Sequence, residues 1–193
     1  HLSIRRQRQM CIRDRGNMLR RVLLSSIRGA AVTSIKIEGI THEFSSIPGV
    51  IEDVTEIILN IKQLALKLND VESTKILINA KGPKEIKAAD IDCGAHVEVL
   101  NKDLHICTLD SKANVNISLT VEEGKGYVPA VKHNNSGDAP LGTIFIDSFF
   151  SPVRRVSFRV ENSRVGQVTD YDKLIMNIET NGCLLYTSDA ADE

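Results

Sequence analysis

The stretch AVTSIKIEGITHEFSSIPGVIEDVTEIILNIKQLAL, residues 31–66, contains two different hydrophobic periods. Its first part alternates along an extended chain, with Val32, Ser34 and Lys36 on one side and Thr33, Ile35 and Ile37 on the other. This alternation predicts a half-buried strand, with Gly39 near a turn into a second strand. Pro48 and Gly49 then interrupt the pattern.

The second part of the stretch has the period of a helix. Its apolar residues recur at spacings of three and four, at Val54, Ile57, Ile58 and Ile61. Acidic residues at 52, 53 and 56 precede Lys62, an order that suits the helix macrodipole.

Short strands are predicted for most of the chain that follows. β-branched residues and a period of two recur in residues 65–69, 73–80, 96–100, 105–109 and 114–123. Residues 124–140 have the composition of a long loop, and residues 142–164 and 171–180 return to strand character. The expected fold class is therefore α+β with a mostly antiparallel β region.

A helix is also predicted upstream, over residues 17–27. Its apolar face consists of Met18, Leu19, Val22, Leu23 and Ile27. Gly29 is a plausible stop for this helix, because glycine tolerates the left-handed conformation of a C-cap.

The two ends of the chain are expected to be foreign to it. Residues 5–15, RRQRQMCIRDR, and residues 183–193, CLLYTSDAADE, can be back-translated into DNA strings that are reverse complements of each other. That DNA resembles a sequencing adapter of the transposase type. We therefore expect residues 1–15 and 183–193 to be adapter-derived and disordered, and we leave them out of the fold prediction.

Composition without these ends excludes several classes of protein. The whole chain has 24 Lys+Arg and 25 Asp+Glu; the ends carry five arginines and four acids, so 19 and 21 remain. This balance provides no strong field for DNA or anionic membranes, and no apolar run approaches the roughly 18 residues of a membrane span. Only Cys93 and Cys107 remain, so a reducing cytoplasm is expected.

Candidate ligating residues are few and poorly spaced. Cys93, His96, His105 and Cys107 do not match the paired spacings of structural zinc sites, so half-buried thiols and surface histidines are the favoured interpretation. Asp90 and Asp92 flank Ile91 and could hold magnesium. They lack a third acid nearby, and a solvated loop before Gly94 is favoured.

Other motifs give no active site either. Residues 122–127, EEGKGY, lack the spacing of a phosphate-binding loop and predict a turn. Arg154 and Arg155 are interpreted as a surface or interface pair. No G-x-S-x-G nucleophile motif occurs, and the sequence contains no tryptophan and 4% aromatic residues, which disfavours a platform for stacking bases.

Several segments nevertheless resemble one family in the same order. They are GNMLRRVLLSS (16–26), EDVTEIILNIKQL (52–64), GKGYVPA (124–130), D-x-F-x-SPV (147–153) and ENSRVGQVTDYDKLIMNIETNG (161–182). Together they resemble the amino-terminal domain of bacterial DNA-directed RNA polymerase alpha subunits. The resemblance covers the span between the two ends.

The resemblance implies a domain organisation. Residues 29–151 would form an inserted, mostly β subdomain, and residues 16–28 and 152–182 would form an incomplete dimerisation subdomain. The first strand of the family, its closing helix and its promoter-binding domain would be missing. We therefore expect this fragment to dimerise weakly and to expose apolar area on its first helix.

The resemblance also implies a function and partners. An alpha subunit has no catalytic residues and no cofactor; it forms a homodimer and assembles the beta and beta-prime subunits for transcription. Arg21 and Leu24 would face beta, and Glu56, Lys62, Ile146 and Val153 would face beta-prime. DNA would be contacted only indirectly. The alternative function is a stand-alone metal- or nucleotide-binding enzyme using the region of Cys93, His96, His105 and Cys107.

Overall fold

A computed structural model describes residues 2–69, 71–111, 113–133, 140–165 and 168–184. The helices are α1 (Leu2–Ser25), α2 (Val54–Ile61), α3 (Ala130–His133) and the 3₁₀ turn η1 (Ala88–Asp90). The first strands are β1 (Arg28–Ile37), β2 (Leu66–Leu68), β3 (Ser73–Lys81), β4 (Lys84–Lys87), β5 (Val97–Val99) and β6 (His105–Leu109). The later strands are β7 (Asn114–Lys125), β8 (Tyr127–Val128), β9 (Thr143–Phe145), β10 (Ser148–Phe149), β11 (Val153–Val165) and β12 (Val168–Thr180).

One antiparallel sheet organises the body of the molecule. Its order is β3-β7-β1-β2-β5, and β9 pairs with β1 beside β2. The pairs β4–β6, β8–β10 and β11–β12 form separate antiparallel ribbons. Within the described residues every strand pair is antiparallel, which confirms the α+β prediction with a mostly antiparallel β region.

The core lies on one face of this sheet and is rich in isoleucine. β7 contributes Val115, Ile117, Leu119 and Val121 at alternate positions, as the period of a strand requires. The α2 residues Val54, Ile57, Ile58 and Ile61 are all buried against this core, so the predicted apolar stripe is confirmed. The Asn60 side-chain amide donates to the Ile106 carbonyl over 3.0 Å and ties α2 to β6.

β1 is more enclosed than its sequence suggests. A β-bulge between Val32 and Ser34 changes the phase of the strand, and residues 32–35 are all buried. The predicted second strand after Gly39 is wrong. β7 occupies one edge of β1, while β2 and β9 occupy the other, so no edge remains for it. Gly39 does mark a turn, with φ +83°.

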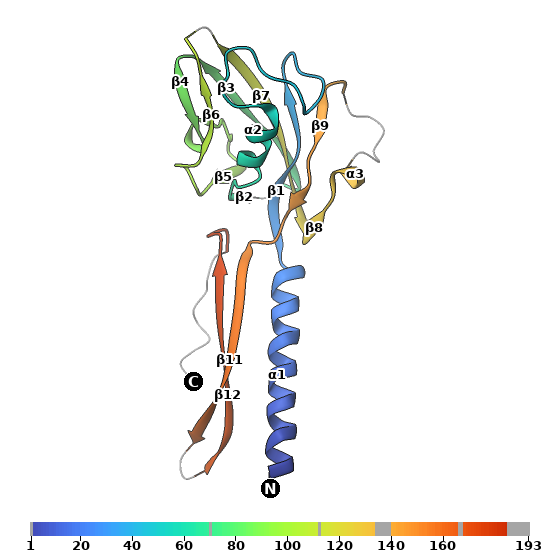
Figure 1. Ribbon diagram of the computed structural model, residues 1–193, viewed down its shortest axis with the longest axis vertical. Coiled ribbons are helices and arrows are strands. Elements are labelled where there is room, and N and C mark those ends of the chain that lie inside the picture. The colour runs from blue at the N-terminus through green and yellow to red at the C-terminus, as the bar shows by residue number, and fades with distance from the viewer. Residues whose placement is uncertain (1, 70, 112, 134–139, 166–167, 185–193) are drawn as a thin grey trace.

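α1 and the β11–β12 hairpin extend side by side away from the sheet (Figure 1). They approach closely at Gly16, where an added Cβ would lie 2.7 Å from ring carbons of Phe158. The exposed side chains of α1 include Met18, Leu19 and Val22. The predicted apolar face of this helix is therefore largely uncovered within the described chain.

The expectation of disorder over residues 1–15 is wrong for residues 2–15, which are helical. That segment contains no proline or glycine, and a helix already nucleated against β11 extends at low cost through residues with favourable propensity. Likewise Cys183 and Leu184 are described, while residues 185–193 lie outside the described residues. The predicted subdomain boundaries stay a prediction.

Two further predictions need correction. α1 ends at Ser25, and Gly29 lies inside β1 rather than capping the helix. The long loop predicted over residues 124–140 contains the short elements β8 and α3, although residues 134–139 lie outside the described part. Among the described helices, none combines the length and the apolar character needed to cross a membrane.

Candidate functional site

Three of the five segments that carry the resemblance meet at one surface, where α2 ends. Lys62 directly follows α2, and its Nζ lies 3.6 Å from Asp147 Oδ2. Asp147 Oδ1 accepts the backbone N–H of Ala130 over 2.9 Å. This N–H and, to a lesser degree, the charge of Lys62 hold the pKa of Asp147 below its usual value. One carboxylate therefore joins the segments 52–64, 124–130 and 147–153.

Two aromatic side chains stand beside this carboxylate. β8 and β10 pair so that Tyr127 lies opposite Phe149, and these residues are 59% and 60% exposed. Ser148 directly precedes Phe149. Its hydroxyl faces inward and donates to the Val32 carbonyl over 2.8 Å. The ribbon is thereby fixed to β1 while its aromatic residues face outward.

A pocket of about 220 Å³ opens at the same place, between the end of α2, β1 and the β8–β10 ribbon. Its wall includes Lys62, Tyr127, Asp147 and Phe149. We call these four residues together with Glu56 on α2 the α2–β10 surface. Glu56 is exposed, about one and two-thirds helical turns before Lys62. The surface combines exposed aromatic area with opposite charges, a composition typical of protein interfaces.

Ile146 and Val153 have a different environment. They are 3% and 1% exposed, so their side chains are covered within this chain. The backbone N–H of Ile146 donates to the Thr33 carbonyl over 3.0 Å, and Val153 begins β11 opposite Thr180. The resemblance implied that both face a partner. In this chain both side chains are covered, and whether they face a partner stays a prediction.

Arg21 and Leu24 lie on the last turns of α1. Arg21 is exposed, and its carbonyl accepts the Ser25 hydroxyl over 2.7 Å. No ion pair of its guanidinium occurs within the described residues. Leu24 is half-buried. This pair lies apart from the α2–β10 surface along the chain, on a separate element.

The four predicted ligating residues do not converge. Cys107 is completely buried, and burial raises the pKa of its thiol to about 12. Burial and the neighbouring Asp92 also raise the pKa of Cys93. The part of the chain that the structure describes contains no group of three or more His, Cys, Asp or Glu side chains arranged to hold a metal ion.

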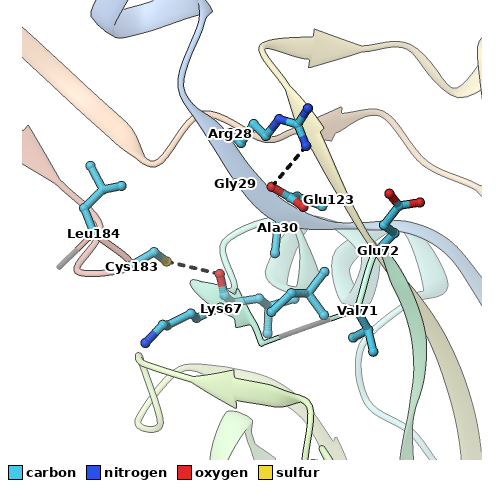
Figure 2. A pocket seen from close by; sticks show the side chains of 11 residues that line it. Arg28, Gly29, Ala30, Lys67, Val71, Glu72, Glu123, Cys183 and Leu184 are labelled. Atoms are coloured by element: carbon cyan, nitrogen blue, oxygen red, sulfur yellow. Dashed lines mark hydrogen bonds and ion pairs between the residues drawn. The ribbon is translucent and has the colours of Figure 1, made fainter.

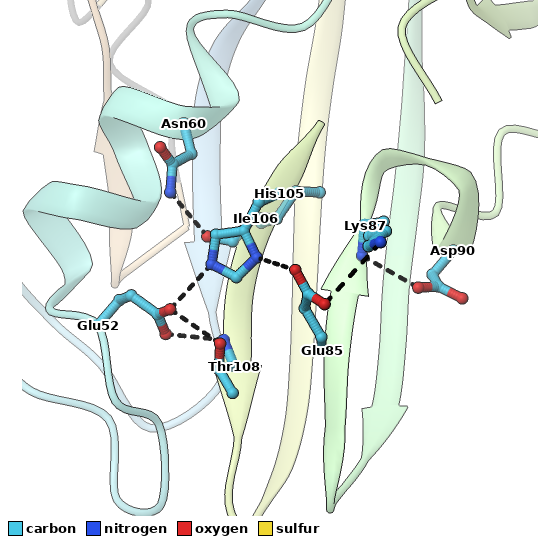
Figure 3. A network of polar contacts seen from close by, with 8 residues as sticks. All are labelled: Glu52, Asn60, Glu85, Lys87, Asp90, His105, Ile106 and Thr108. Carbon is cyan, nitrogen blue, oxygen red and sulfur yellow. Dashed lines mark hydrogen bonds and ion pairs between the residues drawn. The ribbon is translucent and has the colours of Figure 1, made fainter. Parts of the chain in front are cut away.

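His105 belongs instead to a carboxylate network that the sequence did not reveal (Figure 3). Its Nε2 lies 2.9 Å from Glu52 Oε1, and its Nδ1 lies 3.0 Å from Glu85 Oε1. Glu52 also accepts the Thr108 N–H over 2.7 Å and the Thr108 hydroxyl over 3.0 Å. The network links the segment before α2 to β6 and β4. No sequence motif predicts this network, because Glu52 and Glu85 are 33 residues apart.

The other candidates also have structural roles. Asp90 accepts from the Lys84 ammonium and from the Lys87 N–H over 3.0 Å, and these contacts, led by that of Lys84, lower its pKa. Asp92 Oδ1 accepts the Gly94 N–H over 3.4 Å. The turn predicted within residues 122–127 occurs at Gly126, with φ +63°, after β7 ends. Arg154 and Arg155 are exposed on β11, and Arg155 Nη1 lies 3.9 Å from Glu179 Oε1.

A larger pocket of about 330 Å³ lies between the starts of β1 and β2 (Figure 2). Arg28 Nη1 lies 3.9 Å from Glu123 Oε1 in its wall, and Cys183 Sγ lies 3.1 Å from the Leu66 carbonyl. Cys183 and Leu184 form part of this wall. Because both belong to the stretch expected to be adapter-derived, we assign no function to this pocket.

Comparison with known families finds a match that spans α2, the β8–β10 ribbon and most of the sheet. Residues 35–151, more than half of the 193-residue chain, match the family model described as the RNA polymerase Rpb3/RpoA insert domain. The match begins within β1 and ends after β10, so it contains the whole α2–β10 surface. The chain therefore belongs to the RNA polymerase Rpb3/RpoA insert domain family and carries an RNA polymerase alpha-type subunit domain.

Proposed function

We propose that this chain is the non-catalytic alpha subunit of a bacterial RNA polymerase, which dimerises and assembles the beta and beta-prime subunits in the cytoplasm. The family match over residues 35–151 is the observation that carries this proposal. The function consists of presenting shaped surfaces to larger subunits. Bond formation would belong to those subunits.

The α2–β10 surface is the proposed contact with beta-prime. Tyr127 and Phe149 offer large apolar area at little cost in side-chain entropy, a property of residues that dominate binding energy in interfaces. Glu56 and Lys62 supply charges at the rim, where they favour one orientation of the partner. Asp147 keeps Lys62 close to the aromatic pair before the partner arrives.

Ile146 and Val153 would contribute to this contact through the packing of the chain. Because both are buried, their truncation would leave cavities inside it. We therefore expect substitutions there to weaken assembly together with the stability of the chain. Substitutions at Glu56 or Lys62 should weaken assembly alone.

Arg21 is the proposed contact with beta, supported by Leu24. An exposed guanidinium without an ion pair among the described residues can offer its planar fork of donors to a carboxylate or to carbonyl groups of a partner. Leu24 is half-buried on the neighbouring turn and would add apolar area. The homodimer would use the adjoining exposed residues of α1, Met18, Leu19 and Val22.

The test introduces single substitutions into the gene that encodes this chain and measures co-purification with each large subunit. Arg21→Ala should reduce recovery of beta. Arg20→Ala is the matched control, because it removes a neighbouring exposed arginine from the same helix. Equal recovery of beta with both variants would remove Arg21 from the docking surface.

A second pair of variants tests the other surface. Lys62→Ala should reduce recovery of beta-prime in an assembled beta complex, whereas Lys102→Ala, at an exposed position between β5 and β6, should not. Recovery of complete polymerase from both variants would contradict the assignment of the α2–β10 surface to beta-prime.

A further inference from the structure

A third pocket, of about 310 Å³, lies on the sheet face that points away from the core. Ser118, Thr120 and Glu122 of β7 line it, at the positions that alternate with the core residues of that strand. Lys36 of β1 and Lys75 of β3 also belong to its wall. The pocket shares no residue with the α2–β10 surface.

Strand register brings the polar groups of this pocket together. Lys75 lies opposite Thr120, and Thr120 lies opposite Ser34, so the three residues form one row across β3, β7 and β1. Lys36 is two residues from Ser34 on the same face, opposite Ser118. Neighbouring strands are about 4.8 Å apart, so two flexible lysine side chains can reach one small group lying over this row.

Several of these groups lack partners. The Nε2 atom of His133, on α3 at the rim, is enclosed and has no hydrogen-bond partner among the described residues. Ser34 is only 8% exposed, and its hydroxyl makes no hydrogen bond within the part of the chain described. Lys36 and Lys75 take part in no ion pair among those residues. Lys36 and Lys75 are exposed on this face of the sheet, so their ammonium groups are available to an anion that enters the pocket.

The chemistry of the wall selects the ligand. Two ammonium groups and three hydroxyls supply more donors than the two oxygens of a carboxylate can accept, whereas a phosphate group offers more acceptor sites. Lysine binds phosphate as a point charge. Glu122 opposes an anion from the same wall and leaves a modest positive excess, which suits one phosphate group. Phe145 adds an apolar wall for an organic substituent.

We propose that this pocket binds a small phosphate-bearing ligand, with Lys36 and Lys75 contacting the phosphate group and hydroxyl groups of the wall completing its hydrogen bonds. The site is independent of the proposed assembly function, since it uses the opposite face of β7 from the core and none of the docking residues.

Isothermal titration calorimetry on the complete 193-residue chain tests the proposal. Inorganic phosphate and adenosine monophosphate are titrated separately, with adenosine as the control without phosphate. Binding of inorganic phosphate with similar affinity to the nucleotide would identify the free anion as sufficient. Tighter binding of the nucleotide would identify a phosphomonoester as the ligand. Absence of heat with both, or equal binding of adenosine, would overturn the proposal.

Variants locate the binding. Lys36→Gln and Lys75→Gln should each weaken phosphate binding roughly tenfold, the loss expected when one charge-assisted hydrogen bond disappears. Glu122→Gln should strengthen it, because a repelling charge is removed. Lys125→Gln, an exposed lysine on β7 outside the pocket, is the matched control. If Lys125→Gln weakened phosphate binding as much as Lys36→Gln and Lys75→Gln do, the phosphate would be attracted by overall charge and not bound at this pocket. That result would refute the assignment.

Discussion

Lys62 and Asp147, 85 positions apart in sequence, lie with Nζ and Oδ2 3.6 Å apart and connect the end of α2 to the segment before β10. Both side chains are partly exposed, so their ion pair positions groups more than it stabilises the fold. The carboxylate has a second partner in the Ala130 N–H. Substitutions of Asp147 can therefore test the effect of its charge separately from the effect of its hydrogen bond with Ala130.

Asp147→Asn should leave stability nearly unchanged and weaken docking of a partner on the α2–β10 surface. The amide oxygen can still accept the Ala130 N–H, while attraction of Lys62 is lost. We expect a change in the free energy of unfolding below about 1 kcal/mol, measured by urea denaturation. Asp147→Leu is the comparison, because it also removes the backbone contact. If both variants unfold alike, the Ala130 contact contributes nothing.

Glu52 should make stability depend on pH in the acidic range. Burial alone would raise the pKa of its carboxyl, but the Thr108 N–H, His105 and the Thr108 hydroxyl lower it overall from the usual 4.5. The unfolded state then binds protons more readily than the folded state. Glu52 therefore contributes stability that is fully present above pH 4.5 and is lost as the pH falls through the lower folded pKa.

The measurement compares the chain with Glu52→Gln by urea denaturation across this range. The difference in stability should be constant near neutral pH and shrink below pH 4.5. Glu85→Gln is the control, because that carboxylate contacts His105 from a more exposed position. A difference that stayed constant down to the acid limit would show that the Glu52 charge does not contribute through its contacts.

Gly29→Ala should be strongly destabilising. A methyl group there would overlap the backbone carbonyl oxygen of Phe150, which cannot rotate away as a side chain can. Overpacking of this kind costs about 1–3 kcal/mol. Gly39→Ala is the comparison: Gly39 has φ +83° but open space around it, so only conformational strain of about 1 kcal/mol is expected. Equal thermal midpoints for the two variants would contradict the close contact.

These glycines show what the sequence could predict. Periodicity located α2 and most strands correctly, because one face of each meets the core and the pattern is local. It misplaced Gly29, since the reason for that glycine is Phe150, a residue 121 positions away. It also missed the bulge in β1, which depends on the pairing of Val32 and Ser34 with β7.

The candidate surface was predictable to the extent that its residues lay in recognisable segments. Lys62 and Asp147 stand in two of them, but only the fold shows that the two meet, and only the fold shows that the Ile146 side chain is buried. The network of Glu52, Glu85 and His105 could not be foreseen, because its members come from three separate segments with no shared spacing.

The exposed apolar side chains of α1 should cause self-association that increases with protein concentration. Met18, Leu19 and Val22 lie uncovered on one helix, and burying them against another surface removes apolar area from water. Sedimentation velocity over a concentration series should therefore show growing species, and Met18→Gln combined with Val22→Gln should suppress them. Ile51→Gln, at an exposed apolar position away from α1, is the matched control. If Ile51→Gln alone suppressed the larger species, the association surface would lie in the loop before α2 and not on α1.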